Sequence, residues 1–160
     1  MSTRPRLIIV CGLPGAGKTT HTKRLVAELG AVRSSPNEWM DALGIDIYDE
    51  EARARIEALQ WELTQDLLRL GQTAVIEWGT WSKAERDMLR EAARKLGASV
   101  ELHYLEEPID VLWQRVSSRG AESPPIRWSD LLAWAEMFDA PSDEEMSLYD
   151  PPRRTTDPER

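Results

Sequence analysis

A phosphate-binding loop is the clearest chemical signal in the sequence. The residues from Gly12 to Thr19 have the pattern G-x-x-x-x-G-K-T. In such a loop, backbone N–H groups surround a polyphosphate, the lysine reaches the β- and γ-phosphates, and the next hydroxyl binds Mg²⁺. We therefore predict a site for ATP or GTP with Mg²⁺, in which Lys18 is catalytic and Thr19 is the metal ligand. The predicted nucleotide-binding residues are Gly12, Leu13, Pro14, Gly15, Ala16, Gly17, Lys18, Thr19 and Thr20.

The segments on both sides of the loop are those that a phosphate site needs. The apolar, β-branched run 7–10 predicts a strand directly before the loop, and residues 18–29 have a helical pattern. This helix would point the positive end of its dipole at the phosphates. The context favours a nucleotide site over the alternative, a glycine-rich turn without a ligand.

Strand and helix signals alternate along the rest of the chain. Alternation of this kind predicts a parallel sheet with crossover helices. We expect a three-layer α/β fold around a central parallel sheet of four to five strands. Further strands are predicted at 31–35, 73–78 and 100–105, and further helices at 52–70, 82–96, 109–119, 128–138 and from 141 onward.

Periodicity also predicts which faces of these elements are buried. In the helix at 52–70, a buried stripe is predicted by apolar residues that recur every three or four positions. The strand at 100–105 alternates with period two, which predicts that one face is more exposed than in the other strands. The predicted stripe consists of Ile56, Leu59, Leu63, Leu67 and Leu70.

The composition fits one globular domain that acts on a small molecule. The chain has 160 residues, of which 41% are hydrophobic, and a formal net charge of −8. Because nucleic-acid binding normally draws on a basic surface, this charge argues against a nucleic-acid partner. We divide the chain into a P-loop domain, residues 1–140, and a short helix with a disordered tail, residues 141–160.

Cysteine usage and hydropathy predict a cytoplasmic protein without a membrane segment. The single cysteine, Cys11, excludes an intrachain disulfide, and we expect it to be a buried core residue. No apolar run approaches the roughly 20 residues of a membrane span. His21 and His103 have no ligand-like neighbours, so no structural metal is expected. The sequence leaves the oligomeric state open.

Four segments, in this order, resemble the small P-loop kinases of the nucleoside-kinase-like group. They are residues 12–20, residues 35–40, the strand 75–79 with 81–86, and residues 105–108 leading to 115–119. The chain is similar to zeta toxins, chloramphenicol phosphotransferase and phage polynucleotide kinase, relatives often described as AAA-family ATPases. The resemblance implies a central P-loop strand and a helical lid that carries arginines.

Three residues outside the loop are predicted to act on the phosphates. Arg115 and Arg119 lie four positions apart, so one helix face presents both guanidinium groups to an anion. The resemblance implies that they neutralise the transferring phosphoryl group and lie near the adenine; the alternative is two solvated surface arginines. Glu77, at the end of its strand, would support Mg²⁺ through water or touch the acceptor, unless it is a surface glutamate.

The predicted acceptor side departs from the resembling kinases at one position. These relatives place an aspartate after the second strand as the general base, and this chain has Asn37 there. An amide orients a hydroxyl but takes no proton from it. Reduced or absent kinase activity is therefore one expectation. The carboxylates that would replace the base are Glu38, Asp41, Asp46 and Asp49.

Further residues are predicted to contact the acceptor. Trp39, Trp78 and Trp81 would line a site for an apolar or planar compound, although core packing is the alternative for each. Arg86 would contact phosphate or acceptor, unless it forms a surface ion pair. The predicted substrate residues are thus Glu38, Trp39, Trp78, Trp81 and Arg86.

Three functions remain open at this point. The first is an ATP-dependent phosphotransferase that acts on a hydroxyl of a small molecule. The second is a polynucleotide 5′-hydroxyl kinase or a toxin-type nucleotide-sugar kinase on the same scaffold. The third is a catalytically weak ATP-binding module, for which Asn37 is the main evidence.

Overall fold

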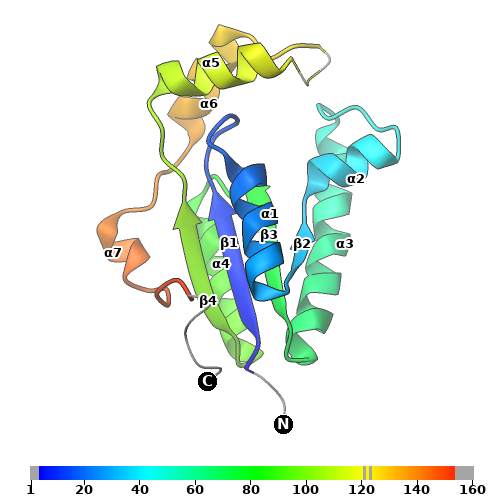
Figure 1. The fold of residues 1–160 in the computed structure, drawn as a ribbon, viewed down its shortest axis with the longest axis vertical. Coiled ribbons are helices and arrows are strands. Elements are labelled where there is room, and N and C mark those ends of the chain that lie inside the picture. The colour runs from blue at the N-terminus through cyan, green and yellow to red at the C-terminus, as the bar shows by residue number, and fades with distance from the viewer. Residues whose placement is uncertain (1–3, 121, 123, 154–160) are drawn as a thin grey trace.

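Four parallel strands form one sheet in the computed structural model, which describes residues 4–120, 122 and 124–153 (Figure 1). The strand order is β2-β3-β1-β4, so the P-loop strand β1 is internal, as the resemblance implies. Disorder was predicted for the tail 151–160, of which residues 154–160 lie outside the described residues. The strands are β1 Arg6–Cys11, β2 Val32–Ser34, β3 Thr73–Gly79 and β4 Ser99–Tyr104.

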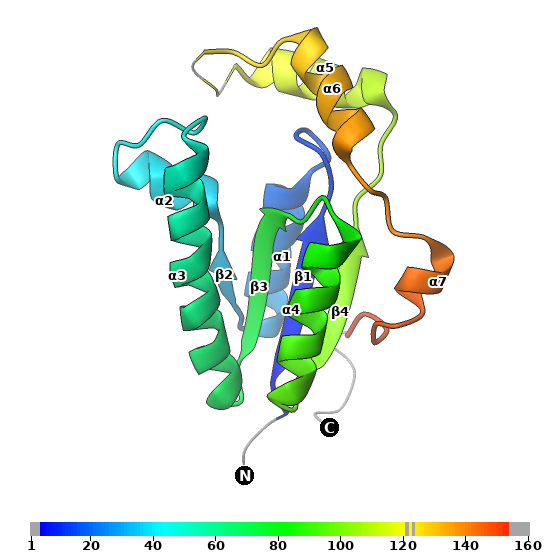
Figure 2. The ribbon, with the colours of Figure 1, turned by 180° about the vertical axis from the view of Figure 1, so that it is seen from behind.

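The helices lie in three places around the sheet. Helix α1 covers one face, α3 and α4 cover the other, and α5 and α6 lie beyond the edge at which the strands end (Figures 1 and 2). This confirms the three-layer α/β prediction, with a helical lid above the P-loop. The helices are α1 Lys18–Leu29, α2 Pro36–Ala42, α3 Glu50–Arg69, α4 Lys83–Lys95, α5 Ile109–Arg119, α6 Trp128–Met137 and α7 Asp143–Met146.

The sheet separates two apolar cores because successive side chains of a strand point to opposite faces. Leu7, Ile9 and Cys11 of β1 pack toward α3 and α4, whereas Ile8 and Val10 pack toward α1. All five side chains are fully buried, which confirms the prediction for Cys11. Burial raises the pKa of the Cys11 thiol to about 11. Among the described residues, no helix is both long and apolar enough to cross a membrane.

The predicted buried stripe of α3 is right only in part. Ile56 is buried and Leu67 packs against the core, but Leu59, Leu63 and Leu70 are 56%, 42% and 73% exposed. The rest of the buried face is formed by Gln60, Thr64 and Leu68. Two polar residues are tolerated on this face because each finds a partner. Gln60 accepts a hydrogen bond from the Trp78 indole at 3.0 Å, and the Thr64 hydroxyl donates to the Gln60 carbonyl at 2.7 Å.

The prediction of an exposed face on β4 is also wrong. Ser99, Val100, Glu101 and Leu102 are all buried although β4 is an edge strand. Glu101 is buried because it contacts Arg6 and His103, and the segment after α6 covers the edge itself. The Asp150 N–H donates to the Val100 carbonyl at 2.7 Å, and the Asp150 carboxylate accepts from the Val100 N–H at 2.8 Å.

Residues 141–150 are therefore packed as part of the domain. Tyr149 belongs to the core under α4, and the carboxylate of Glu145 is 2% exposed. This carboxylate accepts two hydrogen bonds from the guanidinium of Arg86, at 2.7 and 2.9 Å. Arg86 also donates to the carbonyls of Thr80 and Asp139, so one fully buried guanidinium joins α4, the loop after β3 and the C-terminal segment.

Removal of Arg86 should destabilise the domain strongly. We expect Arg86→Met to lower the free energy of unfolding by about 3–5 kcal/mol, because it leaves a buried carboxylate without a cation. The control is Arg55→Met, which removes an ion pair to Glu51 in which both side chains are about three-quarters exposed; it should cost less than about 1 kcal/mol. Urea unfolding of both variants is the measurement, and equal losses would contradict the structural role of Arg86.

Candidate nucleotide-binding and acceptor site

The P-loop joins β1 to α1 and packs against neighbouring segments at two of its glycines, Gly12 and Gly15. A Cβ atom at Gly12 would lie 2.8 Å from the Leu105 carbonyl oxygen, and one at Gly15 would lie 2.8 Å from the Leu112 carbonyl oxygen. Gly15 also has a φ of +87°, a conformation that side chains disfavour. The loop conformation therefore depends on glycine at these positions, as a nest of backbone N–H groups requires.

Lys18 lies inside this loop. Its ammonium group donates to the carbonyls of Gly12 and Leu13 at 2.8 and 2.9 Å. Burial lowers the pKa of Lys18 to about 8, and the negative charge of Glu77 opposes that shift. The charges of Arg119 and Arg53 also lower the pKa of Lys18, because both guanidinium groups repel its ammonium group.

Glu77 lies under the loop at the end of β3. Its carboxylate accepts from the Thr22 hydroxyl at 2.6 Å, from Arg33 at 2.7 Å and from the Thr19 hydroxyl at 3.4 Å. The residue is 8% exposed, so the alternative of a surface glutamate does not apply. The structure thus brings the predicted metal ligand Thr19 and a buried carboxylate together.

Arg33 is a site residue that the sequence analysis missed. It lies in β2 and binds two carboxylates, that of Glu77 and, at 2.7 Å, that of Glu38. Its Nε also donates to the Thr22 hydroxyl at 2.9 Å. The sequence did contain a signal for Arg33, because an arginine within a short predicted strand that ends at the site is a candidate site residue. Because Glu38 is held by Arg33, it lies beside the phosphate site and has a cationic partner.

The two lid arginines have different partners. Arg115 donates to the Gly15 carbonyl at 3.1 Å and pairs with Glu107 at 3.4 Å, so it contacts the P-loop directly. Arg119 pairs with Glu122. Both side chains are exposed at about one half, which leaves them accessible to a bound anion.

Asn37 lies at the start of α2 with an arginine beside it. The guanidinium of Arg53, from α3, donates to the amide oxygen of Asn37. Arg53 is a second residue that the sequence analysis missed. Burial lowers its pKa, and it extends the cationic surface from the phosphate loop toward the predicted acceptor loop.

The four carboxylates named as substitutes for the general base have other surroundings. Glu38 is paired with Arg33 at 2.7 Å. Asp46 accepts from the Tyr48 N–H at 2.9 Å, and Asp49 caps α3 by accepting from the Ala52 N–H at 3.0 Å. Asp41 is exposed on α2. Three of the four carboxylates are therefore already paired or hydrogen-bonded within the protein.

The predicted acceptor residues are only partly brought together. Trp39 is 37% exposed on α2, close in sequence to Asn37. Trp78 packs on Trp61 edge to face, with ring centroids 6.4 Å apart. The ring centroids of Trp81 and Trp134 are 6.1 Å apart. Arg86 does not fit a substrate role, because its guanidinium is fully buried and all of its contacts described above are to the protein.

Two partly buried carboxylates lie on the helices α3 and α4. Glu57 is on α3, one turn after Arg53, and Glu85 is in the first turn of α4. Burial and, to a smaller extent, the negative charge of Glu85 raise the pKa of Glu57 to about 7, although the charge of Arg53 opposes the shift. Burial also raises the pKa of Glu85. Neither carboxylate was among the predicted site residues.

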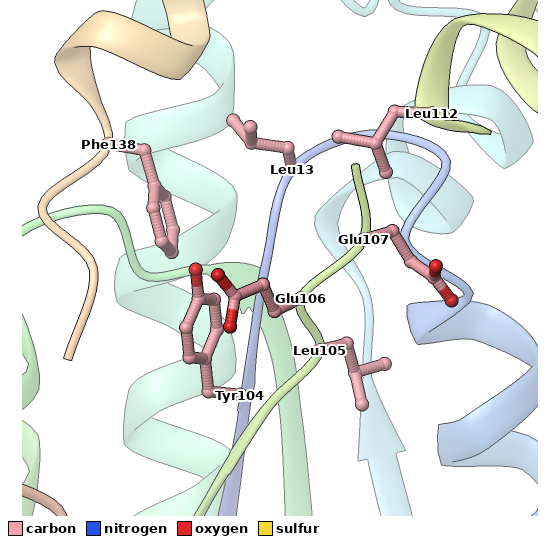
Figure 3. Close-up of a pocket in the computed structure, with 7 residues that line it drawn as sticks. All are labelled: Leu13, Tyr104, Leu105, Glu106, Glu107, Leu112 and Phe138. Carbon is pink, nitrogen blue, oxygen red and sulfur yellow. The ribbon is translucent and has the colours of Figure 1, made fainter. Parts of the chain in front are cut away.

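A small pocket opens beside the loop at the end of β4 (Figure 3). Its volume is about 100 Å³. Tyr104 and Phe138 stack with their centroids 5.6 Å apart, and Figure 3 shows the Glu106 carboxylate beside the Tyr104 hydroxyl. The lining thus combines apolar side chains with the carboxylates of Glu106 and Glu107. It is lined by Leu13, Tyr104, Leu105, Glu106, Glu107, Leu112 and Phe138.

The loop, the sheet order and the lid together define a P-loop domain of the NTPase type. The model of the AAA domain family matches residues 7–140, and the chain belongs to this family.

Solved structures share the fold at low sequence identity. A gluconokinase from Sinorhizobium meliloti 1021 is 21% identical with a TM-score of 0.60, over 89% of this chain and 79% of that one. Kti12 from Chaetomium thermophilum, in complex with ADP-AlF3, is 18% identical with a TM-score of 0.67, over 86% and 82%. A chain of the Pnkp1/Rnl/Hen1 RNA repair complex is 18% identical with a TM-score of 0.73, over 98% of this chain and 51% of that one.

Glu57→Gln should stabilise the protein in a pH-dependent way. The pKa of Glu57 rises from an ordinary 4.5 to about 7 on folding, so the unfolded chain loses this proton first and the folded state loses stability as pH rises through that window. The variant lacks this loss. We expect it to match the native chain near pH 4 and to exceed it by about 2 kcal/mol at pH 8.

Urea unfolding at both pH values is the measurement. The control is Glu62→Gln, which changes an exposed glutamate on the same helix and should leave the difference between the two pH values unaltered. A stabilisation by Glu57→Gln that is the same at pH 4 and pH 8 would contradict the raised pKa.

Proposed function

We propose that this protein is an ATP-dependent phosphotransferase that transfers the γ-phosphoryl group to a hydroxyl of a small molecule. The observation that carries the proposal is the arrangement of Lys18, Thr19 and Glu77 at one end of the sheet, with guanidinium groups on both sides. Phosphoryl transfer depends mostly on positioning and on stabilisation of charge, and this arrangement supplies both.

Each group would have a distinct part in the transfer. The acceptor oxygen forms a bond to the γ-phosphorus, the bond from that phosphorus to the bridging oxygen breaks, and the leaving group is ADP. Lys18 would leave the Gly12 and Leu13 carbonyls to bind the β- and γ-phosphates, and Arg115 and Arg119 would stabilise the charge that shifts in the transition state. Asn37, held by Arg53, would orient the acceptor hydroxyl, whose proton passes to solvent.

The residues at the end of β3 fit a magnesium ion. Mg²⁺ prefers oxygen ligands and keeps several waters, and the Thr19 hydroxyl lies 3.4 Å from a Glu77 oxygen. Thr19 would bind the ion directly and Glu77 would hold one of its waters. The ion would supply charge neutralisation at the phosphates.

The net charge of −8 favours a small acceptor over a polynucleotide, and a single cysteine is in keeping with a reducing cytoplasm.

The second candidate function is that of an ATP-binding module without an acceptor. It is favoured by Asn37, because no carboxylate occupies the position of the expected base.

Lys18→Ala should remove most of the affinity for ATP. A lysine that binds two phosphates contributes about 1.5–3 kcal/mol, which corresponds to a loss of roughly 10- to 100-fold in affinity. Titration calorimetry with Mg²⁺ is the measurement, and circular dichroism checks the fold. Lys23→Ala, at an exposed position of α1, is the matched control. Unaltered ATP affinity in the Lys18 variant would refute the nucleotide site.

Asn37→Asp should raise the rate of transfer if the rest of the acceptor site is intact. A positioned base contributes about 10²-fold or more, and Arg53 would hold the new carboxylate where it now holds the amide. A coupled assay of ADP release with hydroxyl acceptors is the measurement, and Glu62→Gln, at an exposed position of α3, is the control. If neither form phosphorylates any acceptor while ATP still binds, the binding module is the better account.

A further inference from the structure

Arg33 connects the proposed metal site with the proposed acceptor segment, residues 35–40. Its two terminal nitrogens lie 2.7 Å from Oε2 of Glu77 and 2.7 Å from Oε2 of Glu38. Its Nε donates to the Thr22 hydroxyl at 2.9 Å. The side chain of Arg33 is only 10% exposed, so three partners hold a planar and nearly buried fork of donors in one orientation.

The two carboxylates that Arg33 joins belong to different parts of the site. Glu77 is in β3, and its carboxylate also accepts from the hydroxyl of Thr19, the predicted metal ligand, at 3.4 Å. Glu38 is in the first turn of α2, next to Asn37, and its side chain is 52% exposed. Direct contacts therefore run from the end of the phosphate loop, through Arg33, to the first turn of α2.

Neutralisation of Glu77 alone would not require this arrangement. One guanidinium balances one carboxylate, and Glu38 is exposed enough to be solvated by water. Although burial by itself would lower the pKa of Arg33, its hydrogen bonds to Glu38 and Glu77 raise it, so the guanidinium stays charged. With two carboxylates around one cation, the cluster keeps a net negative charge, which attracts a metal ion.

One oxygen of Glu77 is shared between two donors. Oε2 accepts from both Arg33 and the Thr19 hydroxyl, whereas Oε1 accepts from the Thr22 hydroxyl at 2.6 Å. A carboxylate oxygen has two lone pairs, so a magnesium-bound water that donates to Oε2 would weaken the bond from Arg33. The charge of the ion would also repel the guanidinium. Both effects favour the contact of Arg33 with Glu38.

Resting on the proposed transferase function, we propose that Arg33 is a positioning residue that transmits the binding of Mg²⁺ and nucleotide to the acceptor segment. Occupation of the site at Glu77 strengthens the tie between Arg33 and Glu38. The tie fixes the first turn of α2, where Asn37 would orient the acceptor hydroxyl. Because phosphoryl transfer depends on such positioning, the acceptor site is complete only after the nucleotide has bound.

Hydrogen exchange of the backbone amides in α2 tests the tie without an acceptor. Mass spectrometry on the full chain compares the free protein with the protein saturated by a non-hydrolysable ATP analogue and Mg²⁺, with α4 as internal reference. We expect protection of residues 37–42 to rise at least about fivefold, at the low end of typical coupling between two sites. The rise should vanish when EDTA replaces Mg²⁺ at saturating nucleotide. No rise, or a rise that persists in EDTA, would overturn the inference.

Two variants cut the tie while Glu77 keeps a cation. Glu38→Ala removes the exposed carboxylate, and Arg33→Lys replaces the planar fork by one ammonium group, which cannot span both carboxylates. Each should abolish the rise in protection. Because coupling between two sites is reciprocal, each should lower the affinity for the ATP analogue by no more than about fivefold.

The matched control is Glu51→Ala, which removes a carboxylate from an exposed ion pair with Arg55 and should change neither quantity. Urea unfolding checks that each variant is folded. An undiminished rise in Glu38→Ala would contradict the inference even if Arg33→Lys does not fold.

Turnover of a hydroxyl acceptor gives a second readout. Glu38→Ala, Arg33→Lys and the double variant should each lower kcat about tenfold, because losses through one shared contact do not add. KM for the nucleotide should change less than about fivefold. A loss of about 100-fold in the double variant would show that Arg33 and Glu38 act independently, as they would if Glu38 only touched the acceptor.

The outcomes separate this inference from the proposed function. Turnover without a rise in protection, or with a rise that the variants retain, keeps the phosphotransferase and overturns the tie. A rise that needs Mg²⁺, Arg33 and Glu38, without turnover of any acceptor, keeps the tie and overturns the phosphotransferase. Absence of both overturns both.

Discussion

The buried carboxylate of Glu77 is the constraint on which the site depends. A carboxylate at 8% exposure needs strong partners, and it takes three from two elements: Thr19 and Thr22 of α1, and Arg33 of β2. These contacts fix the start of α1 against the ends of β2 and β3. Because the P-loop runs into α1, the same contacts set where Lys18 and the Thr19 hydroxyl lie. The carboxylate is thus both a structural anchor and the negative end of the proposed metal site.

A second constraint comes from the edge of the sheet. β4 has no strand beyond it, and an uncovered edge would leave backbone groups unpaired. Asp150 supplies both a donor and an acceptor to Val100. Glu145 binds the same C-terminal segment to Arg86 of α4. Arg86 in turn holds the Thr80 carbonyl in the loop after β3, where Thr80 has a φ of +41°. The C-terminal segment therefore supports the same end of the sheet at which the site lies.

The parts of the fold that local sequence determines were predictable, and those that depend on distant partners were not. Glycines, a lysine and a threonine at fixed spacing specify the P-loop, and capping residues such as Ser82 specify helix starts. The buried face of α3 was predicted at Ile56 but not at Gln60, because Gln60 is tolerated there through the Trp78 indole, 18 residues away. The role of Arg86 depends on Glu145, 59 residues away, and that of Arg33 depends on Glu77, 44 residues away. Such pairs have no signal within one element.

The distribution of charge divides the site into two unlike halves. Lys18, Arg115 and Arg119 surround the loop, where the phosphates of a nucleotide would lie, and Arg53 continues this positive surface to Asn37. Glu57 lies one helical turn further along α3, and burial together with the charge of Glu85 raises its pKa to about 7, so it carries only part of a negative charge near neutral pH. The positive field is therefore strongest at the loop, where it attracts anions such as the phosphates of a nucleotide. Asn37, whose amide oxygen accepts from Arg53, is the neutral residue that this positive surface reaches.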